Sequence, residues 1–273
     1  MKDRQIKIVI LTGAEPRHTF MRKAIAFDPR FDVLMSICEG AENSLSAQFA
    51  AMKEPDAMMR EHVAQREQSE QDFFGHYAEL VEDVSKPVYI AKGDVNRAEI
   101  VEQVKSKRPD LIVCFGCSLL RDVWLTAFGG KILNMHLGLS PYYRGSGTNF
   151  WAMVNGDFDL VGATFMILDK GIDTGPIIHQ VRARISPNDS PHDIGHRLIV
   201  DAVTAYRNVI SVFDGTSLSF PQSFQFEEKV YFRKHFNRKS VEILYKNFEA
   251  GVVERFLKSS TPYHLILQDS RLA

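Results

Sequence analysis

The sequence has 273 residues, of which 45% are hydrophobic and 25% are charged, and its formal net charge is −1. This is the composition of an ordinary globular protein, and the length fits one large domain or one domain with a small appendage. The balanced charge argues against a nucleic-acid-binding protein, which usually presents a basic face. No apolar run approaches the roughly 18 residues that are needed to cross a bilayer.

The N-terminal stretch and the cysteines indicate the compartment. Residues 1–15 contain a short apolar run, but they also carry acidic residues and lack a small-residue cleavage site, so they resemble a first strand and not a signal peptide. Three cysteines cannot form a disulfide framework, which fits a reducing compartment. We therefore expect a cytoplasmic protein that does not bind membranes.

Strand and helix patterns alternate through the first half of the chain. Apolar runs rich in β-branched residues, typical of buried parallel strands, occur at residues 6–12, 31–38, 87–91, 110–116 and 131–136. Helical spacing occurs at residues 16–27, within the long charged segment 43–82, at 118–128, and from a capping-box-like Asn96 and Glu99 to about residue 107. This alternation predicts an α/β fold with a Rossmann-like, doubly wound, mainly parallel sheet.

The second half begins with two strand patterns, at residues 161–168 and 175–185, joined by a turn-rich loop at 169–174. A long amphipathic helix is predicted over residues 190–213, with Ser190 and Asp193 as its cap. A strand or hairpin near residues 229–233 and a helix over 240–257 follow. We expect one catalytic domain over residues 1–215 and a small C-terminal extension over 216–273.

Cys114 and Cys117 form a C-x-x-C pair directly after a predicted strand. Such a pair can be a redox site or half of a zinc site. No second pair of Cys or His residues follows at metal spacing, so we expect two small, half-buried residues at a strand end and no bound metal.

Three polar or glycine-containing features stand where predicted strands end. They are Thr12-Gly13, Phe115-Gly116 and Asn134-x-His136, and the 169–174 loop adds Asp169 and Asp173. Ligands of open α/β sheets bind at the carboxyl ends of the strands. Asn134 and His136 are two residues apart, so their side chains point the same way from an extended chain, and a carboxylate such as Asp173 can hold the histidine in one tautomer. A single histidine at a strand end is more often structural, so this pair alone does not identify a catalytic site.

A wider motif resembles the formyltransferase family, whose members use N10-formyltetrahydrofolate to formylate amines. The matching residues are Asn134-x-His136, Leu139, Pro141, Tyr143-Arg144-Gly145, Gly162-x-Thr164 and Asp173-x-Gly175-Pro176-Ile177-Ile178. The family includes methionyl-tRNA, glycinamide ribonucleotide and nucleotide-sugar formyltransferases. The resemblance is strong over about residues 110–180, and N-x-H followed at this distance by D-x-G-P-I is a specific signal.

The resemblance implies roles for three catalytic residues. Asn134 would donate a hydrogen bond to the developing oxyanion, and a preorganised donor of this kind contributes on the order of 3 kcal/mol. His136 would stabilise charge and move protons from the amine to the leaving nitrogen. Asp173 would orient His136 and raise its pKa through its charge. No metal is implied.

The sequence departs from the family pattern at three positions. Gly138 stands where the family usually has Ser, Ser140 stands where it has Leu, and Met166 stands where a His is often found. These departures leave the three catalytic positions intact and bear on substrate choice and on the shape of the pocket.

The same resemblance implies a folate site and an amine site. The pterin of the folate would lie between the end of the strand at 110–116 and the 169–174 loop, with Phe115, Gly116, Leu119 and Asp169 as candidates. Tyr143, Arg144 and Gly145 would line the amine side. Gly13, Arg17 and His18 lie at a strand-to-helix turn that suits a phosphate of the substrate, although a solvated helix start explains them equally well.

Length and charge favour a small-molecule amine as the acceptor. Transfer-RNA formyltransferases carry a sizeable C-terminal nucleic-acid-binding domain, whereas only about 58 residues follow residue 215. Glycinamide ribonucleotide enzymes lack such a tail. We expect the acceptor to be an amine of a sugar nucleotide, with an N-hydroxyornithine-type amine or methionyl-tRNA as alternatives. A second copy of the chain, in a homodimer, is a candidate partner.

Three rival functions are compatible with parts of the pattern. A formyltetrahydrofolate hydrolase shares the Asn, His and Asp, but such enzymes carry an extra N-terminal domain, and this sequence opens on its first predicted strand. A non-catalytic folate- or nucleotide-binding module needs no imidazole beside a carboxylate. A Rossmann dehydrogenase needs G-x-G-x-x-G, which residues 12–18 lack.

Overall fold

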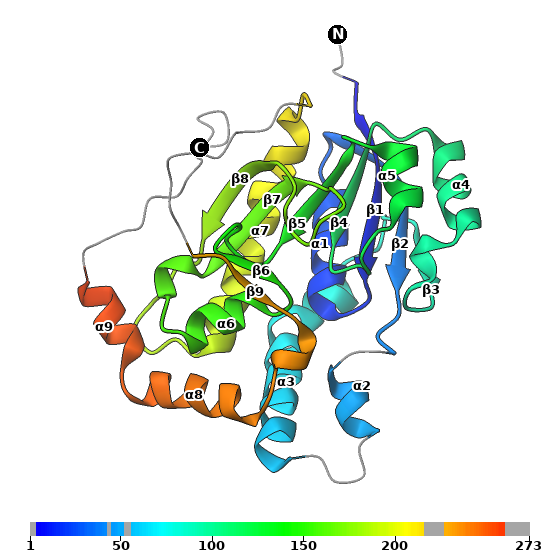
Figure 1. Ribbon diagram of the computed structural model, residues 1–273. Helices are drawn as coiled ribbons and strands as arrows, with labels where there is room; N and C mark the ends of the chain where they lie inside the picture. The colour runs from blue at the N-terminus through cyan, green and yellow to red at the C-terminus, as the bar shows by residue number, and fades with distance from the viewer. Residues whose placement is uncertain (1–3, 43–44, 52–55, 216–226, 260–273) are drawn as a thin grey trace.

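The computed structural model describes residues 4–42, 45–51, 56–215 and 227–259, and its centre is a seven-stranded sheet in the order β3-β2-β1-β4-β5-β7-β8 (Figure 1). The strands are β1 (Ile6–Gly13), β2 (Phe31–Glu39), β3 (Pro87–Ile90), β4 (Leu111–Phe115), β5 (Ile132–His136), β7 (Gly162–Ile167) and β8 (Ile177–Arg182). The first five are parallel, and β7 runs antiparallel to both β5 and β8. The prediction of a Rossmann-like, mainly parallel α/β sheet is confirmed.

Helices cover both faces of this sheet. On one face, α4 (Ala98–Lys107) and α5 (Asp122–Phe128) pack against the strands. On the other face lie α1 (Pro16–Ala26), α3 (Ala57–Leu80) and α7 (Pro191–Val212). The strand order reverses between β1 and β4, so the carboxyl ends of these two strands form the crevice in which ligands of such sheets bind.

The helix α7 behaves as its sequence predicts. Ser190 caps it, because the Ser190 hydroxyl accepts a hydrogen bond from the Asp193 backbone N–H at 3.2 Å, and the Asp193 carboxylate accepts one from the Ser190 N–H at 2.9 Å. Further along the helix, the buried Tyr206 hydroxyl donates to the carbonyl oxygen of Leu133 at 2.7 Å. This bond ties α7 to β5, the strand that ends in His136.

Several boundaries differ from the sequence-based expectation. Asn96 does not cap α4: it lies in the short 3-10 helix η1 (Asp94–Asn96), and its side chain binds backbone atoms of Leu119 and Arg121. The helix expected at 118–128 begins only at Asp122. The helix expected over 240–257 is two helices, α8 (Arg238–Glu249) and α9 (Val252–Lys258), because Gly251 adopts a left-handed conformation with φ of +71° between them.

Other short elements have no counterpart in the sequence-based prediction. They are α2 (Leu45–Ala50), β6 (Tyr143–Gly145), α6 (Thr148–Val154), η2 (Phe158–Leu160) and η3 (Arg233–His235). The strand β6 and the helix α6 matter most, because both directly follow the Asn134-x-His136 motif. They turn the chain back toward β7 and bring Thr148 to the ring of His136.

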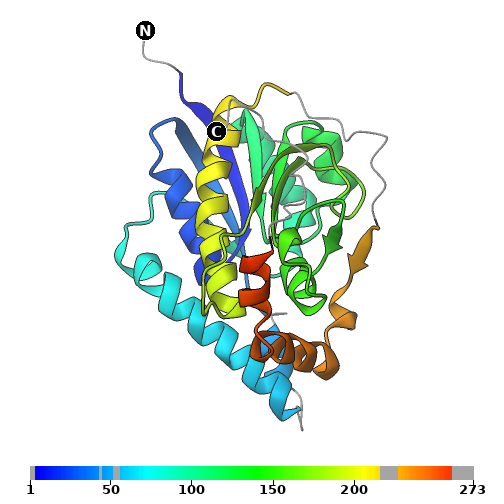
Figure 2. The same ribbon diagram turned by 90° about the vertical axis from the view of Figure 1, so that its left-hand side faces the viewer.

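The C-terminal part returns to this edge. The strand β9 (Lys229–Tyr231) pairs in parallel with β6, and α8 crosses the lower end of the molecule beside α3 and α6 (Figures 1 and 2). The Tyr231 ring stacks on Trp151 of α6, with ring centres 4.4 Å apart. Of the expected extension over 216–273, residues 216–226 and 260–273 lie outside the described part of the chain. Within the described part, no helix is both long and apolar enough to traverse a lipid bilayer.

Candidate active site

Asn134 and His136 leave the end of β5 on the same side of the sheet, as their spacing predicts. Asn134 is half-buried and His136 is buried. Across the ladder, Asn134 is paired with Met166 and His136 with Thr164 of β7. Met166 is 2% exposed and therefore belongs to the core, which explains why a methionine replaces a polar residue there.

The carboxylate of Asp173 lies against the imidazole of His136. The distance from Oδ1 of Asp173 to Nδ1 of His136 is 3.4 Å, and both side chains are largely buried. The second carboxylate oxygen accepts a hydrogen bond from the backbone N–H of Gly145 at 2.9 Å. Asp173 has a φ of +51°, a left-handed conformation that Asp tolerates better than most residues. This turn directs the carboxylate from the β7–β8 loop back toward β5.

The other side of the His136 ring faces two oxygen atoms. Nε2 lies 3.2 Å from the carbonyl oxygen of Tyr143 and 3.5 Å from Oγ1 of Thr148. The Thr148 hydroxyl donates its proton to the carbonyl oxygen of Leu137, so it faces the ring as an acceptor. The ring is therefore held between the Asp173 carboxylate on its Nδ1 side and two oxygen atoms on its Nε2 side.

Hydrogen bonds fix the loop between His136 and β6. The hydroxyl of Thr164 donates to the carbonyl oxygen of Gly138 at 2.7 Å and accepts from the N–H of Ser140 at 3.0 Å. The Gln180 amide donates to the Ser140 carbonyl oxygen at 2.6 Å. The Ser140 hydroxyl is buried and has no hydrogen-bond partner among the described residues. A rigid loop holds Asn134 and His136 relative to the strands behind them.

The residues expected at a folate site lie in two loops that face each other. Phe115 is buried, whereas Gly116 and Leu119 are exposed, Leu119 by 62%. Asp169 folds its own loop, since its carboxylate accepts from the N–H of Gly171 at 2.9 Å and from the Thr174 hydroxyl at 2.8 Å. An ion pair of 3.4 Å between Lys170 and Asp122 joins the two loops.

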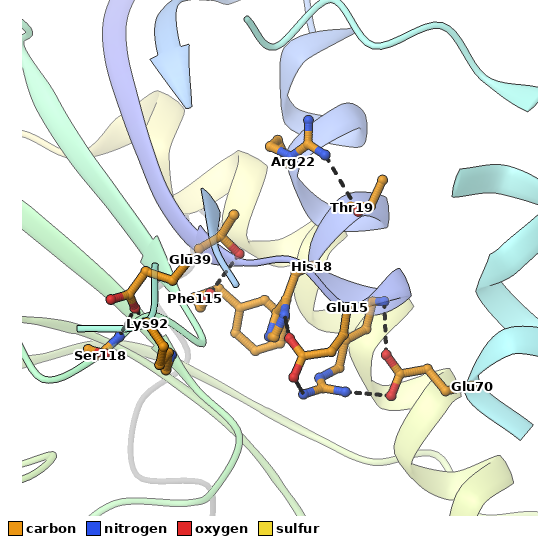
Figure 3. A network of polar contacts seen from close by, with 11 residues as sticks. Glu15, His18, Thr19, Arg22, Glu39, Glu70, Lys92, Phe115 and Ser118 are labelled. Carbon is orange, nitrogen blue, oxygen red and sulfur yellow. Dashed lines mark hydrogen bonds and ion pairs between the residues drawn. The ribbon is translucent and has the colours of Figure 1, made fainter. Parts of the chain in front are cut away.

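The loop after β4 is held by a buried carboxylate that sequence reasoning did not single out. Glu39, at the end of β2, is fully buried and accepts hydrogen bonds from the backbone N–H of Ser118 and, at 2.8 Å, of Gly93 (Figure 3). Its third partner is the ammonium group of Lys92 at 3.1 Å. One side chain therefore links the ends of β2, β3 and β4.

The residues expected to line the amine site contact other parts of the protein instead. Tyr143 is fully buried, its hydroxyl donates to Asp157, and burial raises its pKa, so its side chain belongs to the core and does not line an open site. The Arg144 guanidinium is paired with Glu228 at 2.7 Å. Gly145 has a φ of +97°, and a side chain there would collide with the Tyr231 carbonyl. These residues join the catalytic loop to β9.

The turn between β1 and α1 contains its own carboxylate. Glu15 approaches Nδ1 of His18 at 2.5 Å and Arg17 at 3.5 Å (Figure 3). Burial alone would raise the pKa of Glu15, but the hydrogen bond and charge of His18 and the charge of Arg17 hold it well below its usual range. Arg17 is also paired with Glu70 of α3. Gly13 is buried against the His18 ring. The two side chains suggested for a phosphate, Arg17 and His18, thus already have carboxylate partners.

The cysteine pair shows no sign of reactivity. Cys114 is fully buried, and burial together with the neighbouring Cys117 raises its pKa well above the usual value, which disfavours the thiolate. Within the described ranges, no three His, Cys, Asp or Glu side chains come together in a way that would hold a metal ion.

Three contributors to the site escaped sequence reasoning: Thr148, Glu39 and Glu15. Thr148 begins a seven-residue helix, too short for a periodic signal, although the glycines at 145 and 147 mark the turn before it. Glu39 and Glu15 were visible as acidic residues at strand ends. Nothing in one sequence distinguishes them from solvated turn residues.

Comparisons with known proteins point to one protein family. Residues 35–210, well over half of the chain, match the formyl transferase family. A methionyl-tRNA formyltransferase from Thermodesulfovibrio yellowstonii is 34% identical over 102 residues, which cover 37% of this chain and 32% of that protein. The matched segment thus spans only about a third of the length of this curated relative.

Solved structures of similar fold include two kinds of formyltransferase. Phosphoribosylglycinamide formyltransferase from Anaplasma phagocytophilum has a TM-score of 0.55 at 16% identity, over 84% of this chain and 100% of the other. An N-formyltransferase from Helicobacter canadensis, in complex with folinic acid and dTDP-3-aminofucose, has a TM-score of 0.53 at 18% identity, over 85% and 73%. At these identities the likeness shows a shared fold.

Proposed function

Because this chain belongs to the formyl transferase family, we propose that it transfers the formyl group of N10-formyltetrahydrofolate to a primary amine, that of a nucleotide-linked amino sugar. The observation that carries the proposal is the meeting of Asn134, His136 and Asp173 at the carboxyl edge of the sheet, where the Asp173 carboxylate lies 3.4 Å from the His136 ring. The sequence motif predicts the same three residues, and the family match supports the activity.

The proposed roles follow from the chemistry of acyl transfer. The amine nitrogen attacks the formyl carbon, the carbonyl oxygen gains negative charge, and the C–N bond to the folate then breaks. The Asn134 side chain, which has no hydrogen bond to the described residues, is free to donate to the oxyanion. His136 takes the proton that the attacking amine loses and passes it to the leaving nitrogen as the C–N bond breaks, and Asp173 holds the ring in place.

The folate side of the site is proposed to lie between the loop after β4 and the 169–174 loop. The first offers exposed backbone at Gly116 and the exposed side chain of Leu119, and the second is stiffened by Asp169. Backbone groups held by Glu39 and Asp169 suit recognition of a pterin edge, since such groups change position little on binding. The folate supplies the formyl group, and these residues bind and orient it.

Two observations favour a sugar-nucleotide amine as the acceptor. The formal net charge of −1 is not the basic balance that is typical of nucleic-acid-binding proteins. The Helicobacter canadensis N-formyltransferase, whose structure includes a sugar nucleotide, matches over 85% of this chain.

The test is an assay of N10-formyltetrahydrofolate consumption with a panel of amino-sugar nucleotides, and N-hydroxyornithine and methionyl-tRNA as further acceptors. We expect consumption that requires an amino sugar nucleotide and yields a product 28 Da heavier by mass spectrometry, the mass of one formyl group replacing hydrogen. Consumption without any acceptor would identify a hydrolase instead. Formylation of N-hydroxyornithine or methionyl-tRNA alone would overturn the choice of acceptor.

A further inference from the structure

One face of α3 carries polar side chains where it packs against the first turns of α7. His62 and Glu70 are buried on this face. The His62 ring lies 5.7 Å from the ring of His192, and the hydroxyl of Ser69 lies 3.0 Å from Nε2 of His196. Residues four apart on a helix share a face. Arg66 is four residues from both His62 and Glu70. It therefore lies on this face, between the His62–His192 contact and the Ser69–His196 contact.

Arg66 has no partner within the described part of the chain. It is half-buried, yet its guanidinium makes no hydrogen bond or ion pair there. The nearby carboxylates are already engaged: Glu70 accepts from both the backbone N–H and the guanidinium of Arg17, and Glu15 is bound by His18 and Arg17. Burial, followed by the charge of Arg17, lowers the pKa of Arg66. The guanidinium thus has no direct ion pair among the described residues, and its five N–H donors are available to a ligand.

Two imidazoles neighbour Arg66. Nδ1 of His62 lies 2.9 Å from the hydroxyl of Tyr245, whereas its Nε2 makes no hydrogen bond to the described residues. Nε2 of His192 is buried and has no hydrogen-bond partner among the described residues. Burial lowers the pKa of His62 to about 4, and His192 and Arg66 add to this. Burial likewise lowers the pKa of His192 to about 4, with His196 and Arg66 contributing and Asp193 opposing. The remaining charged groups that act on Arg66 are Arg17, Glu15, Glu67 and Glu70.

This cluster lies beside the catalytic loop. His62 packs against the ring of Phe150 on α6, with centres 5.7 Å apart, and Thr148, two residues before Phe150, contacts Nε2 of His136. Arg17 stands in the first turn of α1, next to the carboxyl end of β1. In Figure 2, α3 passes beside the N-terminal end of α7 at the same end of the molecule.

We propose that Arg66, His62 and His192 bind a phosphate group of the acceptor amine. The proposal rests on the proposed function, because it names the anchor of that acceptor. A phosphate or diphosphate presents several acceptor oxygens and a double negative charge, which a guanidinium fork flanked by two imidazoles can bind together. A carboxylate offers only two oxygens and one charge. The phosphate would supply the counter-ion that Arg66 lacks.

Binding of inorganic pyrophosphate tests the proposal without any turnover. Isothermal titration calorimetry at pH 7 and constant ionic strength should detect pyrophosphate binding to the wild type. The Arg66→Gln variant should bind about tenfold more weakly or worse, whereas Arg60→Gln, on an exposed position of the same helix, should bind like the wild type. The proposal would be overturned if the wild type and Arg66→Gln bound pyrophosphate equally well. It would also be overturned if the wild type did not bind pyrophosphate, or if it bound succinate as tightly.

Two further measurements separate a binding role from a structural one. Without ligand, Arg66→Gln should unfold in urea at the same or a higher midpoint than the wild type, because it removes an unpaired charge; a clear loss of stability would indicate a structural role. In histidine NMR titrations, pyrophosphate should raise the pKa of His62 and His192 in the wild type and not in Arg66→Gln. Unchanged titration in the wild type would contradict the site. These results do not depend on whether formyl transfer occurs.

Discussion

The Cα atom of Gly138 lies so close to the imidazole of His136 that a Cβ at this position would be 2.6 Å from Nε2. The same Cβ would collide with Oγ1 of Thr148. The threonine hydroxyl therefore occupies the space that a serine at position 138 would need. Glycine at 138 and threonine at 148 form a matched pair, which accounts for the departure from the Ser of the family motif.

The first prediction follows from this pair. Gly138→Ser should lower kcat by about tenfold or more, because Thr148 or the His136 ring must move, and overpacking of this kind commonly costs about 1–3 kcal/mol of stability. Steady-state kinetics and urea denaturation would measure both effects. The double variant Gly138→Ser/Thr148→Ala frees the space and should recover part of each loss. A fully active single variant would contradict the close packing.

The second prediction concerns Asp173. Asp173→Asn keeps the size of the side chain and an oxygen for the Gly145 N–H, but it removes the charge that faces Nδ1 of His136. We expect kcat to fall by about a hundredfold, within the range for loss of general acid–base function, while the unfolding midpoint changes little. Asp201→Asn, which likewise removes a paired carboxylate charge but lies on α7 in an ion pair with Arg184, is the matched control. Near-wild-type kcat for Asp173→Asn would exclude the carboxylate from the mechanism.

The third prediction separates binding from chemistry at Glu39. Glu39→Gln weakens the bonds to the backbone of Ser118 and Gly93 and removes the ion pair with Lys92. The loop after β4 should become less ordered, so KM for the folate should rise several-fold while kcat at saturation stays within about twofold of the wild type, as for a group that supports binding alone. A matched loss of kcat with unchanged KM would place Glu39 in the chemical step.

Much of this fold could be predicted because its central strands are mostly apolar. Most residues of β1, β2 and β5 are buried, and a strand of that kind is visible in a single sequence. The Ser190 and Asp193 cap was also visible, because it depends only on residues that are neighbours in the chain. Local rules succeed where the determining contacts are local.

The rest depended on contacts between residues far apart in sequence. Tyr143 and Arg144 carry the family motif, yet their partners are Asp157 and Glu228, and only the folded chain reveals them. Asn96 fits a capping box, but its amide is used to hold the loop at Leu119 and Arg121. The charge of Arg17 is taken up by Glu70, 53 residues away. A motif locates the reacting groups, but it does not show which cations remain free for a substrate.

The fourth prediction concerns the pH dependence of stability and depends on His62 and His192. Both have a folded-state pKa of about 4, below the ordinary value of 6.5, chiefly because burial disfavours the charged ring. Between these pH values the unfolded chain binds protons that the folded chain does not. The stability that these residues contribute is therefore fully present above about pH 6.5 and is lost as the pH falls toward 4.

Urea denaturation at pH 7, 6 and 5 would measure this loss. Each histidine contributes a slope of at most about 1.4 kcal/mol per pH unit, so the free energy of unfolding should fall measurably at each step. His192→Gln should reduce the change of the unfolding free energy per pH unit, because glutamine does not titrate. The stability of this variant relative to the wild type should therefore increase as the pH falls. His76, an exposed residue of α3, provides the control His76→Gln, which should leave the slope unchanged. A free energy of unfolding that stays constant from pH 7 to pH 5 would show that the two buried rings accept protons without cost, and it would contradict their lowered pKa values.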